Sequence, residues 1–192
     1  MLLNIMNRKL LLIICLLTFT CAATYATTSA DTAQTDRGYI VKVGDQAPDD
    51  FELVLTDGTK TSLKQLRGKV VILQFTASWC SVCREEMSHL QKDVWEAYKN
   101  KGLVLIGVDR DEPIKKVQKF HQDMKITYNL ALDPQANIFG RFANKKSGVT
   151  RNVVINRDGR IVYLTRLYDP QEFASMVKVI DAFVNNKNAS AN

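Results

Sequence analysis

Residues 69–83 read KVVILQFTASWCSVC, an apolar run that leads directly into a pair of cysteines. The run Lys69–Phe75 has the length and the continuous apolar character of a strand buried at the centre of a sheet. The segment Trp79–Cys83, WCSVC, then forms a turn before a helical pattern begins. Two cysteines separated by two residues can be a redox dithiol, half of a metal site, or a peroxidase nucleophile with a neighbour.

Strand and helix patterns alternate along the rest of the chain. A helix over 85–101 is predicted from apolar residues at helical spacing, namely Met87, Leu90, Val94 and Tyr98. The remaining patterns predict strands over 103–109 and 128–133, helices over 113–124 and 171–184, a helical turn over 136–142, and hairpins at Asp57-Gly58 and Asp158-Gly159. This order predicts an α/β fold with a central mixed β-sheet flanked by helices and an N-terminal β-hairpin extension. Sites in such sheets form at the carboxyl ends of the central strands, where WCSVC lies.

The first 26 residues have the order of a signal peptide. Arg8 and Lys9 precede an apolar run, 10–17, that is too short to span about 30 Å of hydrocarbon. Small residues follow, with candidate cleavage sites after Ala23 or Ala26. We therefore expect export to the periplasm, with an uncleaved membrane anchor as the alternative.

The composition divides the chain into four parts. These are a signal peptide over 1–26, a disordered lead-in over 27–37, one globular domain over 38–185 and a disordered tail over 186–192. Lipidation of Cys21 ranks below simple cleavage, because Thr20 fits a lipoprotein cleavage box poorly. Loss of the two basic leader residues lowers the net charge from +6 to +4. The remaining cations are scattered among acids, which argues against a nucleic-acid-binding surface.

Export changes which cysteines matter. Cys15 and Cys21 would leave with the leader, so Cys80 and Cys83 would be the only cysteines of the mature protein. A loop of two residues is too small to add much stability, and an oxidising compartment favours redox work. At the start of the predicted helix, backbone N–H groups and the helix dipole would lower the pKa of Cys80 and make it the attacking thiol. Cys83, one turn further along, would resolve the mixed disulfide.

Three segments carry a resemblance to a known family. They read GDQAPDDFELVLTDGTKTSLKQLRGKVVILQFTASWCSVCREEM, GLVLIGVD and GVTRNVVINRDGRIVYL. They resemble the exported thioredoxin-fold proteins of the TlpA and ResA type, with a lead-in like that of AhpC/TSA proteins. The resemblance implies a thioredoxin-like domain over 38–185 and a periplasmic thiol-disulfide oxidoreductase that reduces disulfides of cysteine-containing envelope proteins. It also implies a membrane thiol electron donor, and no cofactor or metal besides the redox-active disulfide Cys80–Cys83.

Two departures from the family pattern affect the dithiol directly. Gln74 stands where thioredoxins often bury an acid that takes the proton of the resolving thiol, so Asp109 or Asp111 is an alternative acceptor. Thr150 stands where the family usually has a cis-proline. A cis bond before a non-proline residue costs about 3 kcal/mol, so a trans peptide between Val149 and Thr150 is predicted.

A third departure is Ser88, which replaces a proline in the active-site helix and leaves the usual kink in doubt. Several other residues are candidate supports of the site. Trp79 would act as a lid or would pack in the core, and Ser81 and Val82 would tune the redox potential. The backbone of Val149 would pair with substrate.

Polar residues near the cysteines complete the candidate set. The guanidinium of Arg151 would stabilise the Cys80 thiolate, pair with a carboxylate, or simply lie on the surface. The Ser78 hydroxyl would donate a hydrogen bond to a sulfur. Glu85 and Glu86 are most simply acids that favour the positive end of the helix dipole.

Three other functions compete with the oxidoreductase. A thiol peroxidase shares the fold and the lead-in, but Ala77 and Leu73 stand where its hydroxyl and its proline would be. A non-catalytic binding module would leave the WCxxC pattern unexplained. A zinc site would need two ligands more than one cysteine pair supplies, so it would require a dimer.

Overall fold

A computed structural model describes residues 37–186 of the chain. The predicted signal peptide lies outside the described residues, as do the predicted lead-in except for Arg37 and the predicted tail except for Asn186. Within the described part, no helix combines the length and the apolar character needed to cross a bilayer.

A five-stranded mixed sheet forms the centre, with the strand order β5-β4-β3-β6-β7. Its strands are β3 (Val70–Thr76), β4 (Leu103–Arg110), β5 (Asn129–Asp133), β6 (Arg151–Ile155) and β7 (Ile161–Arg166). β3, β4 and β5 are parallel, and β6 and β7 run antiparallel to their neighbours. Every residue of β3 is buried, as its continuous apolar run predicts.

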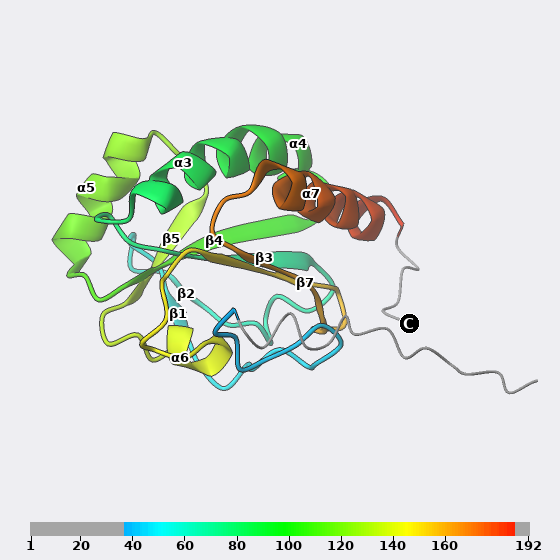
Figure 1. Ribbon diagram of the computed structural model, residues 1–192, viewed down its shortest axis with the longest axis horizontal. Coiled ribbons are helices and arrows are strands. Elements are labelled where there is room, and N and C mark those ends of the chain that lie inside the picture. The colour runs from blue at the N-terminus through cyan, green and yellow to red at the C-terminus, as the bar shows by residue number, and fades with distance from the viewer. Residues whose placement is uncertain (1–36, 187–192) are drawn as a thin grey trace, which may run out of the picture.

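Helices cover one face of this sheet (Figure 1). They are α3 (Ser81–His89), η1 (Leu90–Trp95), α4 (Glu96–Tyr98), α5 (Ile114–Met124) and α7 (Pro170–Asn185). Their apolar stripes meet the sheet in one core cluster, which includes the predicted helix residues Met87, Leu90, Val94 and Tyr98. α7 begins where the Asp169 carboxylate accepts hydrogen bonds from the backbone N–H groups of Gln171 and Glu172.

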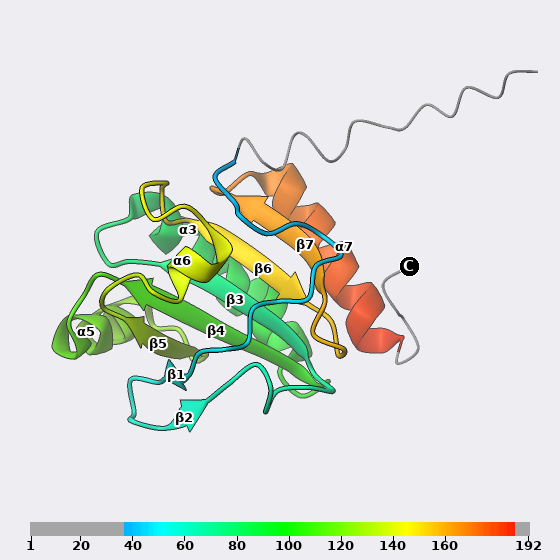
Figure 2. The same ribbon diagram turned by 90° about the horizontal axis from the view of Figure 1, so that it is seen from below.

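The opposite face is covered by the N-terminal segment and by α6 (Phe139–Phe142), as Figure 2 shows. The segment includes the predicted hairpin, β1 (Leu53–Val54) and β2 (Lys60–Thr61), which turns at Asp57 and at Gly58 with a φ of 87°. A second core cluster fills this side of the sheet. The predicted α/β layout with its preceding hairpin is therefore the observed one.

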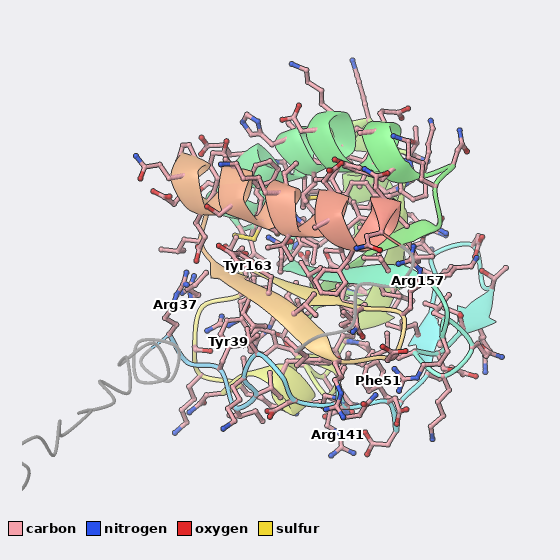
Figure 3. The ribbon with its side chains drawn as sticks, turned by 90° about the vertical axis from the view of Figure 1, so that its right-hand side faces the viewer. Arg37, Tyr39, Phe51, Arg141, Arg157 and Tyr163 are labelled. Carbon is pink, nitrogen blue, oxygen red and sulfur yellow. A yellow bond between two sulfur atoms is a disulfide. The ribbon has the colours of Figure 1, made fainter. Side chains whose placement is uncertain are left out.

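The start of the described chain is tied to the end of β7. The Arg37 guanidinium donates to the backbone carbonyl of Arg166 and to both carboxylate oxygens of Glu172. The buried Tyr39 hydroxyl donates to the carbonyl of Thr165. Figure 3 shows Arg37 and Tyr39 beside the same end of β7. These contacts fix the strand end that lies nearest the cysteines.

The active-site helix differs from the sequence prediction in two details. It begins at Ser81, directly after Cys80, rather than at Glu85. It also changes to a π-helix at Leu90, two residues after Ser88. The irregularity that a proline would introduce thus takes another form, since π-helical turns widen a helix without removing its N–H donors.

Candidate active site

Cys80 ends the turn between β3 and α3, at the carboxyl ends of β3 and β4, and Cys83 lies in the first turn of α3. Cys80 is the N-cap of α3, and its sulfur accepts a hydrogen bond of 3.2 Å from the backbone N–H of Cys83. The two sulfurs form a disulfide, with the Cα atoms 5.3 Å apart. The predicted position of Cys80 at the positive end of a helix is therefore observed.

The two cysteines differ in exposure. The exposed fraction is 9% for Cys80 and 0% for Cys83. Trp79 is 60% exposed beside them, which excludes the alternative that it packs in the core. Ser81 is exposed and Val82 is half-buried. An incoming molecule can therefore approach Cys80 but not Cys83.

Thr150 faces the disulfide from the start of β6. Its hydroxyl oxygen lies 3.2 Å from the sulfur of Cys80 and 3.2 Å from that of Cys83. No peptide bond in residues 37–186 is cis, so the Val149–Thr150 bond is trans, as predicted. A hydroxyl that can donate to a thiolate thus takes the place of an apolar proline ring.

A buried carboxyl group lies one turn after Cys83. Glu86 is 1% exposed, and burial raises the pKa of its carboxyl to about 7. Hydrogen bonds from the Asn152 side chain (2.6 Å) and from the Gln74 side chain (3.4 Å) oppose that shift. The interpretation of Glu86 as simply a helix-start acid is therefore wrong, because its carboxyl is buried beyond the first turn of α3. Its spacing from Cys83, Met87 and Leu90 is the signal that could have placed it on the buried stripe.

Gln74 connects Glu86 to the sheet. Its amide donates to Glu86, and its amide oxygen accepts a 2.9 Å hydrogen bond from the Tyr128 hydroxyl. β3 therefore keeps a buried polar side chain at this position, while the carboxylate comes from α3 instead.

A second carboxylate holds the turn before Cys80. Glu112 accepts hydrogen bonds from the Ser78 backbone N–H (2.6 Å) and the Ser78 hydroxyl (2.7 Å), and it pairs with Lys116 at 2.6 Å. Burial raises the pKa of Glu112, but the contacts with Lys116 and Ser78 outweigh it and leave that pKa below its ordinary value. Ser78 therefore donates to this carboxylate rather than to a cysteine sulfur, contrary to our expectation. Sequence reasoning missed Glu112 because 34 positions separate it from Ser78.

Asp109 and Asp111, the alternative proton acceptors, lie in different environments. Asp109 is fully buried opposite Thr76, and neither of its carboxylate oxygens has a hydrogen-bond partner among residues 37–186. Burial and the charge of Glu112 raise its pKa to about 8. Asp111 pairs with Arg110. Glu86 lies one helical turn after Cys83 on the buried face of α3, so it is the better-placed acid.

Arg151 is buried with its guanidinium turned to the backbone. It donates to the carbonyls of Gly148 and Arg37 and to the Ser147 hydroxyl. Burial lowers its pKa to about 10, and the neighbouring cations Arg166, Arg37 and Arg110 act in the same direction. Within the described chain it bonds neither a cysteine sulfur nor a carboxylate. Arg151 shapes the loop that carries Val149 and Thr150.

No group of three or more His, Cys, Asp or Glu residues in the described part of the chain could hold a metal ion. The arrangement at the cysteines is that of an exchangeable dithiol: an accessible sulfur at a helix N-terminus, and a buried partner sulfur one helical turn before a carboxyl group whose pKa burial raises to about 7.

Comparison with known proteins places the chain among similar sequences. The AhpC/TSA family model matches residues 43–164. The thiol-disulfide oxidoreductase ResA of a Bacillus cereus strain is 30% identical over 122 residues, which cover 64% of this chain and 68% of that protein. ResA of Geobacillus kaustophilus is 34% identical over 104 residues, covering 53% and 58%.

Solved structures share the fold. A candidate protein disulfide isomerase from Bacteroides thetaiotaomicron has a TM-score of 0.75 and 53% identity, and the match covers 78% of this chain and 94% of that one. The candidate thiol:disulfide interchange protein DsbE from Chlorobium tepidum has a TM-score of 0.65 and 26% identity, covering 75% and 99%. A yeast mitochondrial 1-Cys peroxiredoxin, at 22% identity and a TM-score of 0.61, shares the fold alone. The thioredoxin fold is confirmed, and the peroxidase alternative has less support.

Proposed function

The chain belongs to the AhpC/TSA family and is a ResA-type thiol-disulfide oxidoreductase, and from this premise we propose that it is exported and reduces disulfides of other proteins through Cys80 and Cys83. The observation that carries the proposal is the contrast between the accessible Cys80 sulfur at the N-terminus of α3 and the fully buried Cys83 sulfur.

In the first step, the Cys80 thiolate attacks one sulfur of a substrate disulfide. A mixed disulfide forms between Cys80 and the substrate, and the second substrate cysteine leaves as a thiolate. The Cys83 N–H and the Thr150 hydroxyl support this role, since each can donate to the Cys80 thiolate.

In the second step, Cys83 attacks the Cys80 sulfur. The Cys80–Cys83 disulfide forms and the first substrate cysteine leaves, so two electrons have passed from the protein to the substrate. Cys83 must lose its proton for this attack. Glu86 is suited to accept it, because a carboxyl group with a pKa of about 7 can take up and release a proton near neutral pH.

The sulfur environment supports the reducing direction. A strongly stabilised thiolate makes a dithiol an oxidant, because it stabilises the reduced form. No lysine, arginine or histidine of residues 37–186 donates a hydrogen bond to either sulfur, and ionised Glu86 disfavours a nearby thiolate. Neither sulfur therefore receives, from these residues, the hydrogen bond from a cation that would favour an oxidant. A membrane thiol donor would return the two electrons, and cysteine-containing envelope proteins would be the substrates.

Export rests on the leader sequence. Residues 1–26 combine a basic start, a short apolar run and small residues, the order of a cleaved signal peptide. The mass of protein recovered from the envelope fraction tests this part. We expect a mass that begins after residue 23 or 26, whereas an intact N-terminus would contradict cleavage.

Insulin reduction by dithiothreitol tests the activity. The full-length chain is expressed, and the exported protein is purified in the form that remains after processing in the cell. We expect accelerated precipitation of insulin chains and little consumption of hydrogen peroxide. Peroxide consumption without insulin reduction would sink the proposal in favour of a thiol peroxidase.

A further inference from the structure

A groove of about 290 Å³ runs beside the disulfide. One wall carries Trp79 and Cys80, and the other carries Thr150 with the end of β7, Arg166 and Leu167. Trp79 and Leu167 are two of the large apolar side chains that residues 37–186 leave exposed, at 60% and 48%. Two exposed apolar side chains in one groove next to a reactive sulfur form a surface suited to binding a polypeptide.

The backbone holds Leu167 in an unusual conformation. Its φ is +64°, in the left-handed region that branched side chains rarely adopt. Its N–H donates to the Thr150 carbonyl at 3.2 Å, so a hydrogen bond to the residue facing the disulfide fixes this conformation. Strain of this kind concentrates at functional sites. The fold thus presents Leu167 to the groove at a cost in stability.

Arg166 adds a positive charge to the same wall. One guanidinium nitrogen donates to the Thr150 carbonyl at 3.4 Å, and the other lies against Gly148, where an added Cβ would collide with it. Glycine at 148 therefore leaves the space in which the guanidinium lies. The Arg166 side chain is half-buried along this loop and lines the groove.

The charge of Arg166 has no carboxylate partner within the described chain. The nearby acid Glu172 is bound through both oxygens by the Arg37 guanidinium, and it accepts only the backbone N–H of Arg166. Burial lowers the pKa of Arg166, and the positive charge of Arg37 lowers it further. An arginine in a groove, with free donors and no anion, is suited to bind a carboxylate from outside.

From this juxtaposition we propose that the groove binds substrate polypeptides in which an acidic side chain lies within about two residues of the reactive cysteine. Arg166 pairs with that carboxylate, and a neighbouring apolar side chain packs on Trp79 and Leu167. The spacing follows from Thr150, which bonds Arg166 through its carbonyl and contacts both sulfurs through its hydroxyl. One residue thus bridges the guanidinium and the disulfide, and two extended residues of a substrate span about 7 Å along the same groove. The inference rests on the proposed function and specifies its substrate class.

Single-turnover oxidation of the reduced, exported protein by three peptide disulfides tests the inference. The peptides are identical except for Glu, Gln or Lys two residues from the cysteine. Tryptophan fluorescence follows the reaction, and each rate is divided by the rate at which dithiothreitol reduces the same peptide, which removes intrinsic thiol reactivity. We expect the Glu peptide to react about fivefold faster than the Gln peptide and the Lys peptide to react slowest. The ratio should shrink in 0.5 M salt.

Variants assign the preference to Arg166. Arg166→Gln should remove the ratio between the Glu and Gln peptides, and Arg166→Lys should keep part of it. Gly148→Ala, which keeps the charge but displaces the guanidinium, should reduce it. Arg160→Gln is the matched control, because Arg160 is an exposed arginine at the opposite end of β7 that donates to the Gly44 carbonyl. Its ratio should equal that of the wild type.

The outcomes separate the inference from the proposed function. Equal normalised rates for the three peptides would overturn the inference and leave the reductase intact. A preference for the Glu peptide that survives in Arg166→Gln would equally overturn the role of Arg166. Failure to react with any of the peptides would overturn the proposed function and the inference with it.

Discussion

The two sulfurs of one disulfide lie in opposite surroundings. Cys80 borders an open groove, caps a helix and follows a turn that Glu112 holds in place. Cys83 is fully buried, and Glu86, three residues further along α3, is buried as well. A sulfur that must meet a large substrate needs access, and a sulfur that must wait for an intramolecular attack needs shielding. The difference in exposure therefore assigns the attack on the substrate to Cys80 and the resolution of the mixed disulfide to Cys83.

Replacing either cysteine should have the largest effect, because each carries out one of the two steps. Cys80→Ser should lower insulin reduction to the uncatalysed rate, because the accessible nucleophile is lost. Cys83→Ser should still attack substrate but stop at the mixed disulfide, which non-reducing electrophoresis would detect as covalent adducts. Adducts formed by Cys80→Ser and not by Cys83→Ser would reverse the assignment.

Removing Glu112 should loosen the Cys80 side. Glu112→Ala leaves the half-buried Ser78 N–H and hydroxyl without their charged acceptor, so we expect a loss of about 2 kcal/mol in unfolding free energy. Displacement of the turn should slow insulin reduction about tenfold.

Urea denaturation and the insulin assay measure the two effects of Glu112→Ala. Glu52→Ala is the matched control, because the exposed Glu52 carboxylate pairs with Lys60 at the surface, and the change in its unfolding free energy should stay within about 0.5 kcal/mol. Equal losses in both variants would show that Glu112 has no special role at the turn.

Replacing Glu86 by an uncharged residue tests the surroundings of Cys83 through the pH dependence of stability. The folded protein holds a carboxyl proton up to a pH of about 7, whereas the unfolded chain loses it near the ordinary carboxyl pKa of 4.5. Wild-type stability must therefore fall as pH rises through this window, because the unfolded state binds fewer protons. Glu86→Gln has no carboxyl group to titrate. The unfolding free energy of the variant minus that of the wild type should therefore increase by about 2 kcal/mol between pH 5 and pH 8.

Unfolding of the oxidised proteins at the two pH values measures this change without thiol titration. Glu85→Gln provides the control, since Glu85 is the exposed neighbour on the same helix. A difference in unfolding free energy between Glu86→Gln and the wild type that does not change with pH would contradict a raised pKa of Glu86.

The smallest effect is expected at Thr150, which contacts both sulfurs. Thr150→Val removes a hydroxyl that can donate to a thiolate and thereby stabilise the reduced form. We expect a reduction potential about 20 mV more negative, equivalent to about 1 kcal/mol. Equilibrium with glutathione measures it. An unchanged or more positive potential would show that the hydroxyl does not bond the thiolate.

Local patterns were enough to predict the scaffold. The run Lys69–Phe75 and the stripe from Met87 to Tyr98 became β3 and a buried helix face, because periodicity within one element determines which side chains it can bury. The same order of elements predicted that Cys80 lies at the start of a helix, although that helix begins four residues earlier than predicted. The trans peptide at Thr150 was predictable because its cost depends only on the residue type.

Contacts between distant segments were not predictable in this way. Glu112 reaches Ser78 from another strand end, and the conformations of Gly148 and Arg166 depend on each other across a loop. Glu86 was misread because an acid in a first helical turn has a sufficient local explanation, which concealed its place on the buried stripe. Residues that tune the site come from tertiary packing, and single-sequence patterns do not report it.

Limited alkylation of the reduced protein tests the central contrast most directly. The exported protein is reduced, treated with less than one equivalent of iodoacetamide at neutral pH, and digested for mass spectrometry. We predict that the label is on Cys80, because its sulfur is accessible and accepts a hydrogen bond from the backbone N–H of Cys83. Cys83 should stay unmodified until the protein unfolds. Preferential labelling of Cys83 in the folded protein would contradict the account.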